Sequence, residues 1–236
     1  MDEDFVGLSA AFSGTMLLLR REFLSAAADA AEAIKVRADS EAAGFKEFAE
    51  SGGIAEIPDG NARAAFWINA FNGLVSLSII ELGVRLELPR YPAYRIRTVL
   101  KTGNQGFSLD DIEEGILRGN RPAPDWPFRP FAPNDERRLM VLGNPDFRFH
   151  FALNCGSSSC PPVRQYSAAV LDRQLADAES DFAAAHFHPD PAARSILCSR
   201  LFASRRKDLP GRWLDDPAHR GWRIVLEPFD LRPGPG

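Results

Sequence analysis

Along its most apolar stretch the sequence reads Ala64-Ala-Phe-Trp-Ile-Asn-Ala-Phe-Asn-Gly-Leu-Val-Ser-Leu-Ser-Ile-Ile80. These 17 residues carry no charge, but they are fewer than the roughly 20 that a membrane-spanning helix needs, and they include Asn69 and Asn72. The stretch therefore predicts a helix that is buried in a protein core rather than a membrane span. Gly83 is well placed to end this helix.

Polar residues form a narrow stripe on this apolar helix. At about 100° per residue, Asn69, Asn72 and Ser76 share one face. Buried amides need hydrogen-bond partners, so two interpretations are open. Asn69 and Asn72 bind substrate or orient a catalytic group, or they tie the helix to the backbone of a neighbouring loop.

The whole chain has the composition of a globular protein. Of its 236 residues, 45% are hydrophobic and 25% are charged, which excludes a disordered or fibrous chain. The net charge of −4 argues against a protein whose main role is to bind nucleic acid. Three patterns predict helices: the periodicity of residues 8–35, the capping box Ser108-Leu-Asp-Asp111 and the amphipathic run 168–187. Residues 147–153 are predicted to form a strand. We expect a single α+β domain with helices packed around a small, mostly antiparallel sheet.

The densest group of chemically versatile residues is His150-Phe-Ala-Leu-Asn-Cys-Gly-Ser-Ser-Ser-Cys-Pro-Pro162. Here the predicted strand delivers a histidine and a cysteine to a loop of small residues, whose backbone N–H groups can surround an oxyanion. A thiol in that position is a candidate nucleophile if a cation or a dipole lowers its pKa. We predict Cys155 as the nucleophile and His150 as its base or orienting group, with Asn154 and the backbone of Gly156 stabilising the oxyanion.

Further residues complete this hypothetical site. Glu113 flanks the apolar face of the helix that follows Ser108, where it could reach a buried partner such as Arg118 or His150. We expect Glu113 and Asn69 to support the catalytic groups. The remaining candidates for substrate contact are Asn72, Gly156, Ser159 and Cys160. The basic stretch 194–212 is interpreted as a solvated face.

Other interpretations of the same segment are open. An extended strand would separate His150 from Cys155 by roughly 16 Å, so a direct pair requires the chain to fold back near Asn154 or Gly156. Cys155 could instead be a small buried apolar residue, with His150 a hydrogen-bonded core residue. A reversible disulfide between Cys155 and Cys160 would make a redox sensor. A metal site of His150, Cys155 and Cys160 lacks a fourth ligand, so we predict no metal and no cofactor.

Three segments together resemble the DUF547 domain of bacteria, plants and nematodes: residues 65–72, 109–118 and 146–162. The likeness runs in order from about residue 40 to residue 231. It implies a DUF547-like domain over 40–231. The helical periodicity predicts an N-terminal helical segment over 1–39, and the residues Arg232-Pro-Gly-Pro-Gly236 predict a loose tail over 232–236. Family members often carry His where this chain has Glu114, and Asp-Trp where it has Asp230-Leu231. In animals and plants the domain occurs beside glutaredoxin-like, DEP or leucine-zipper segments, which implies thiol chemistry or a scaffold role by analogy.

Two functional hypotheses follow. The first is a thiol-dependent hydrolase or acyl transferase of unknown substrate. The second is a non-catalytic module that binds a ligand or another protein and carries a redox-sensitive Cys pair. The acidic start of the chain predicts a cytoplasmic protein. We expect its partner to be a small molecule or a peptide, and neither nucleic acid nor a membrane; the sequence leaves the oligomeric state open.

Overall fold

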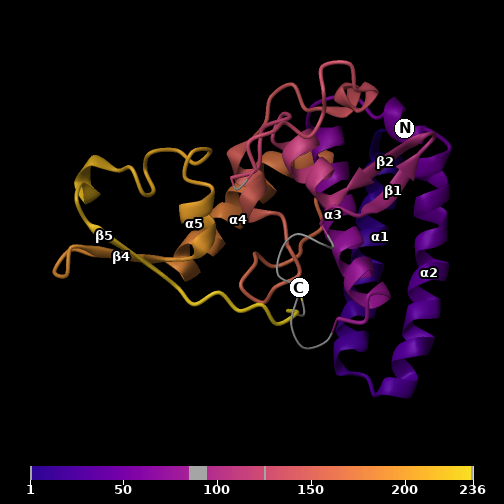
Figure 1. Cartoon of the computed structure of the whole chain (residues 1–236), viewed down its shortest axis with the longest axis horizontal. Helices are drawn as coiled ribbons and strands as arrows, with labels where there is room; N and C mark the ends of the chain where they lie inside the picture. The colour runs from indigo at the N-terminus through magenta and orange to yellow at the C-terminus, as the bar shows by residue number, and fades with distance from the viewer. Residues whose placement is uncertain (1, 85–94, 125, 235) are drawn as a thin grey trace.

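The computed structural model describes residues 2–84, 95–124, 126–234 and 236. Three long helices, α1 (Asp2–Ser25), α2 (Ala28–Glu50) and α3 (Asn61–Glu81), lie side by side and form the main core (Figure 1). The predicted helix over 8–35 is therefore two helices. The first ends at Ser25, whose hydroxyl donates to the carbonyls of Arg21 and Glu22 and so competes with the helical ladder.

Helix α3 is the centre of this core. It is long and apolar enough to cross a membrane, but 94% of its most apolar window is buried inside the protein. The prediction of a buried core helix is confirmed, and Gly83 ends it with a φ of +67°. Gly73 lets α1 approach closely, because a Cβ atom at this position would lie 2.5 Å from the ring of Phe12 and 3.2 Å from the Cα of Ser13.

The strands form two small sheets at the edges of the molecule. In the first, β1 (Thr98–Thr102) pairs antiparallel with β2 (Gln105–Ser108). In the second, β4 (Ser195–Cys198) lies between β3 (Phe187–Asp190), to which it is antiparallel, and β5 (Arg223–Leu226), to which it is parallel. The expected single α+β domain with mostly antiparallel pairing is confirmed, although its strands divide between two sheets.

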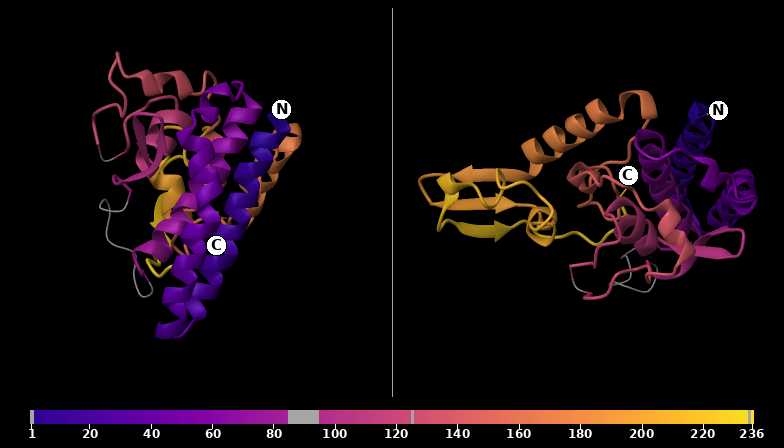
Figure 2. Two further views of the ribbon diagram at one scale, coloured as in Figure 1. Left: turned by 90° about the vertical axis from the view of Figure 1, so that its right-hand side faces the viewer. Right: turned by 90° about the horizontal axis from the view of Figure 1, so that it is seen from above.

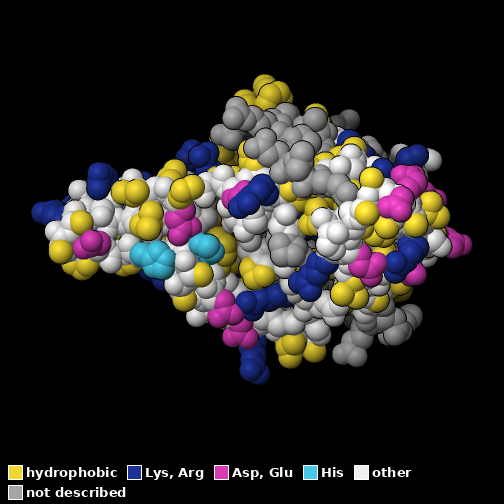
Figure 3. All heavy atoms as spheres, turned by 90° about the horizontal axis from the view of Figure 1, so that it is seen from below, with side chains coloured by type: hydrophobic (Ala, Val, Ile, Leu, Met, Phe, Trp, Pro, Cys, Tyr) yellow, Lys and Arg dark blue, Asp and Glu magenta, His cyan; other side chains and the backbone are white. Residues whose placement is uncertain are grey.

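Helix α4 (Leu171–His186) connects the helical bundle to the second sheet, which projects away from the bundle together with α5 (Arg200–Ser204) (Figure 2). A smaller apolar core lies there, built from Phe151, Phe182, Ile196, Cys198 and Phe202. On the face drawn in Figure 3, acidic and basic side chains are interspersed over the described residues.

The strand predicted over 147–153 is wrong. Residues Phe147–Phe151 form a 3-10 helix, η4, whose first turn is capped by the carboxylate of Asp146 accepting from the backbone N–H of Arg148 at 2.8 Å. The reason lies in packing. The side chain of Phe149 packs in the main core and that of Phe151 in the smaller one. In a strand, side chains two residues apart point to the same face, whereas in a helix of three residues per turn they point in different directions.

Two described residues of the segment 232–236, predicted to be a loose tail, are hydrogen-bonded to the loop after Cys155. The N–H of Gly234 donates to the carbonyl of Gly156 at 2.9 Å, and the N–H of Ser158 donates to that of Arg232 at 3.0 Å. We call residues 229–234 the C-terminal strap. It runs back from β5 to the bundle (Figure 1).

The close approach of α1 and α3 can be tested with Gly73→Ala. We expect this change to lower the free energy of unfolding by about 1–3 kcal/mol, because the added methyl group meets Phe12 and the backbone of Ser13. Urea denaturation measures the effect. Gly44→Ala is the matched control in α2, where a Cβ meets nothing within 4 Å, and it should stabilise the protein by about 0.4–1 kcal/mol. Equal stabilisation by both substitutions would contradict this packing.

Candidate functional site

The chain does fold back after η4, at a turn that Asn154 holds together. The side-chain oxygen of Asn154 accepts from the N–H of Gly156 at 2.8 Å and from the guanidinium of Arg20 at 3.2 Å, while its amide nitrogen donates to the carbonyl of Pro161 at 2.6 Å. Gly156 has a φ of +97°, a conformation that favours glycine. The amide of Asn154 and the N–H of Gly156, expected to stabilise an oxyanion, are therefore both used inside the turn.

Asn69 and Asn72 tie α3 to the neighbouring backbone. Asn69 donates to the carbonyl of Tyr166 at 2.8 Å and accepts from its N–H at 2.9 Å. Asn72 donates to the carbonyl of Ala152 at 3.0 Å and accepts from the N–H of Asn154 at 2.9 Å. Both side chains are fully buried, so the structure favours the tie between helix and loop over a contact with substrate.

Beside the turn lies a pocket of about 1000 Å³. It brings together five of the predicted site residues: Glu113, His150, Cys155, Ser159 and Cys160. Much of its wall is apolar and comes from segments far apart in the sequence: Phe71, Ile96, Trp126, Phe128, Phe229 and Leu231. The other predicted residues, Asn69, Asn72, Asn154 and Gly156, are not among the described residues that line it.

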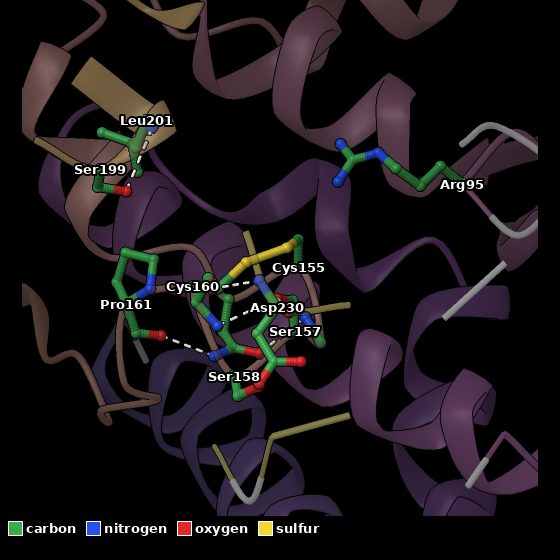
Figure 4. Close-up of a disulfide and its surroundings, with 12 residues drawn as sticks. Arg95, Cys155, Ser157, Ser158, Cys160, Pro161, Ser199, Leu201 and Asp230 are labelled. Atoms are coloured by element: carbon green, nitrogen blue, oxygen red, sulfur yellow. Dashed lines mark hydrogen bonds between the residues drawn. A yellow bond between two sulfur atoms is a disulfide. The ribbon is translucent and has the colours of Figure 1, made fainter. Parts of the chain in front are cut away.

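One part of the pocket wall is a disulfide. Cys155 and Cys160 are joined by an S–S bond, and both are half-buried, whereas Cys198 is a free, buried cysteine. Figure 4 shows the cystine together with Arg95, which lines the same pocket and lies apart from the S–S bond. The structure thus contains the bond that the interpretation of a reversible disulfide requires. Among the described residues, no three His, Cys, Asp or Glu side chains are placed to hold a metal ion.

A network of ion pairs forms the polar side of the pocket. Glu113 accepts hydrogen bonds from Arg95 and Arg205 rather than from Arg118 or His150. Glu114 pairs with Arg118 and, at 2.9 Å, with Arg205. Because Arg205 reaches this buried network from the stretch 194–212, that stretch is not simply a solvated face.

Asp208 is the second centre of this network and was not predicted. Its carboxylate lies 2.6 Å from the guanidinium of Arg118 and 3.0 Å from Nε2 of His150.

The positions of Glu113 and Glu114 depend on the π-helix η2 (Asp111–Leu117), a rare conformation that is frequent at functional sites. Its start follows the predicted capping box: Ser108 Oγ accepts from the N–H of Asp111 at 3.1 Å, and the carboxylate of Asp111 accepts from the N–H of Ser108 at 2.8 Å.

The ion pairs set the protonation of the pocket. Burial opposes the ionisation of Glu113, but Arg205 and Arg95 outweigh it and lower its pKa to about 2. Burial and the adjacent charge of Glu113 raise the pKa of Glu114 above its usual range. Burial also lowers the pKa of His150, although Asp208 opposes the shift. His150 is therefore neutral at pH 7 and donates from Nε2 to the ionised Asp208. This hydrogen bond orients the imidazole toward the Asp208 carboxylate.

Residues 56–183, more than half of the chain, match the family described as "Protein of unknown function, DUF547". The chain belongs to the DUF547 family. The matched region contains Glu113, His150, Cys155 and Cys160, whereas Arg205, Asp208 and the C-terminal strap lie outside it. The chain matches no curated protein and no solved structure.

The disulfide leads to a testable prediction about the reactivity of the three cysteines. In the native, oxidised protein we expect iodoacetamide to modify neither Cys155 nor Cys160, and dithiothreitol to make both reactive. Cys198 should stay unmodified until the protein unfolds, because burial raises its pKa to about 11. Peptide mass spectrometry reads out all three positions. Alkylation of Cys155 and Cys160 without a reductant would show that the bond does not form.

The buried carboxylate of Glu113 makes a prediction about stability. Glu113→Gln leaves Arg95 and Arg205 without their shared charge, so we expect a loss of about 3 kcal/mol in the free energy of unfolding at pH 7. Because the pKa of Glu113 falls from 4.5 to about 2 on folding, its contribution is complete above pH 4.5 and is lost as the pH falls toward 2. The variant should therefore lose part of the acid sensitivity of the wild type.

Urea titrations at several pH values measure this effect. Glu22→Gln is the control, because Glu22 forms an exposed pair with Arg37 and should contribute less than about 1 kcal/mol. Equal losses in the two variants would contradict the assignment of a buried network.

Proposed function

We propose that this DUF547 chain is a binding module for a small amphipathic molecule with an anionic group, and that the wall of its pocket carries a redox-sensitive Cys pair. The observation that carries the proposal is the composition of the pocket of about 1000 Å³ beside Cys155, which combines aromatic walls, arginines and a cystine.

The size and the walls of the pocket fit an organic ligand. Ligand pockets typically enclose about 300–1000 Å³ and are mostly apolar with a few polar groups. At this pocket the rings of Trp126 and Phe128 contact each other edge to face, with centroids 5.6 Å apart. Both side chains are more than 60% exposed, so they offer apolar surface that a ligand could cover.

Arg200 is the cation best suited to bind an anionic group. The carboxylates of Asp110, Glu113 and Glu114 already neutralise Arg95 and Arg205 in this pocket. Within the described part of the chain no carboxylate pairs with Arg200, whose guanidinium lies over the ring of Phe229, 6.0 Å from its centroid. A ligand that places its anion on Arg200 would lay its apolar part along Phe229 and the neighbouring walls.

The thiol-dependent hydrolase or acyl transferase is the second candidate, because Cys155 and His150 share this pocket. It would require the reduced protein, since a disulfide-bonded sulfur is not a nucleophile. The geometry supports it less well. His150 is oriented by Asp208, and the groups expected to stabilise an oxyanion hold the turn instead.

The binding proposal can be tested with 8-anilinonaphthalene-1-sulfonate and its uncharged parent, N-phenyl-1-naphthylamine. We expect Arg200→Ala to weaken binding of the sulfonate about fivefold, which corresponds to the ~1 kcal/mol of a partly exposed charge-assisted contact, and to leave the uncharged dye unaffected. Fluorescence titration gives both dissociation constants.

Arg173→Ala is the control, because Arg173 is 84% exposed and is not among the residues lining the pocket. Identical affinities of wild type and Arg200→Ala for the sulfonate would contradict the assigned anion site, and no binding of either dye would contradict the pocket's proposed role.

A further inference from the structure

The C-terminal strap is attached to the loop that the disulfide closes. Ser157 Oγ donates to the carbonyl of Asp230, whose own N–H donates to Ser159 Oγ at 2.8 Å. The N–H and the hydroxyl of Ser158 both donate to the carbonyl of Arg232, at 3.0 and 3.1 Å. Figure 4 shows Ser157, Ser158 and Asp230 beside the cystine. These hydrogen bonds, with the one from Gly234 to the carbonyl of Gly156, therefore attach the strap to residues 156–159.

The cystine restricts the conformations of this same loop. Cys155 and Cys160 stand at its two ends, five positions apart in the sequence. Without the S–S bond, the ends are still joined by the hydrogen bond from Asn154 to the carbonyl of Pro161. The loop also keeps the hydrogen bonds from Arg20 to the carbonyl of Gly156 and from the N–H of Cys160 to the carbonyl of Ser157. Hydrogen bonds confine a loop less than a covalent bond does, so the serines that hold the strap would gain freedom on reduction.

The strap is also a wall of the pocket. Phe229 and Leu231 line the pocket, and the guanidinium of Arg200 lies over the ring of Phe229. Movement of the strap would therefore remove apolar surface and displace the ring beside the proposed anion site. The loop, the strap and the pocket wall are therefore in contact from the disulfide to Phe229 and Arg200, where the proposed anion site lies.

We propose that the Cys155–Cys160 disulfide is a redox lock that holds the C-terminal strap over the pocket, and that reduction by a small dithiol releases the strap and weakens ligand binding. This redox lock would regulate the proposed binding function, and the part of its test that measures ligand binding rests on that function. Both cysteines line the pocket and are half-buried, so a small reductant can reach the S–S bond from the pocket.

The chemical step is thiol–disulfide exchange. One thiolate of the dithiol attacks a sulfur of the cystine, and the other cystine sulfur leaves as a thiolate. The second thiol of the reductant then displaces the protein sulfur from the mixed disulfide. The dithiol becomes a cyclic disulfide, and its two electrons and two protons are transferred to Cys155 and Cys160, which become free thiols.

Hydrogen exchange on the full chain, read by mass spectrometry, tests the lock. We expect dithiothreitol to speed exchange of the amides of Asp230 and Gly234 at least about tenfold, while the hairpin of β1 and β2 is unchanged. A variant with Cys155→Ser and Cys160→Ser should exchange like the reduced wild type with or without dithiothreitol. Unchanged exchange of the strap in the reduced wild type, in which the thiols are shown to be free, would overturn the proposal.

The variant Gly234→Ala tests the position of the strap without changing the disulfide. A Cβ at Gly234 would lie 2.8 Å from the Cα and 3.0 Å from the backbone nitrogen of Ser158, so it should displace the strap while the disulfide stays intact. The oxidised variant should then exchange like the reduced wild type. Gly211→Ala is the matched control, because its Cβ would make only ordinary contacts, at 3.9 Å, and it should keep the redox response.

The dye titration distinguishes failure of the lock from failure of the binding role. We expect reduction to raise the dissociation constant of 8-anilinonaphthalene-1-sulfonate about tenfold in the wild type and to have no effect in Gly234→Ala. If the dye binds through Arg200 and neither its affinity nor strap exchange responds to reduction, the lock is wrong. If strap exchange responds but the dye does not bind, the lock stands and the binding role fails.

Discussion

The buried amide of Asn154 is the interaction on which the rest of the pocket depends. Asn154 is 2% exposed, and its polar groups bond to Asn72 of α3, to Arg20 of α1 and to its own loop. An unsatisfied buried polar group costs about 1–3 kcal/mol, so these partners constrain one another strongly. The turn that carries Cys155 is thereby fixed to the helical bundle, and the strap is fixed to the loop that follows.

The polar side of the pocket follows a different rule. Burial penalises charged groups, and the structure offsets this penalty by surrounding each carboxylate with arginines. Glu113 lies between Arg95 and Arg205. Asp208 pairs with Arg118 and Arg121 and accepts a hydrogen bond from the neutral His150. Since those charges already compensate one another, an incoming anion would depend on Arg200 at the rim rather than on the buried arginines.

The sequence predicted those features that depend on local pattern. The apolar run of α3, the capping box at Ser108 and the apolar stripe of α4, in which Leu171, Leu175, Ala178 and Phe182 are buried, follow from spacing along one element. His150, Cys155, Ser159 and Cys160 were predicted to share one site from their neighbourhood in the sequence, and Glu113 from its position beside the apolar face of its helix. Their individual roles did not follow from the sequence.

The features that the sequence did not predict depend on partners far along the chain. Alternating aromatic residues at 147–151 resemble a strand, but they divide between two cores that local pattern cannot reveal. Arg205 and Asp208 lie in a basic stretch that resembles a solvated surface until Glu113 and His150 are seen beside it. The strap, Phe229-Asp-Leu-Arg-Pro-Gly234, makes hydrogen bonds that reach residues more than 70 positions earlier.

The most direct measurement of the central claim is a crystal structure of the oxidised protein with bound 8-anilinonaphthalene-1-sulfonate. The account predicts the sulfonate on Arg200 and the aromatic rings against Phe229, with the disulfide and the strap in place. The structure has a second cavity of about 790 Å³, lined by residues that include Asp59, Arg148 and Arg212. Dye found there, with the pocket beside Cys155 empty, would contradict the account.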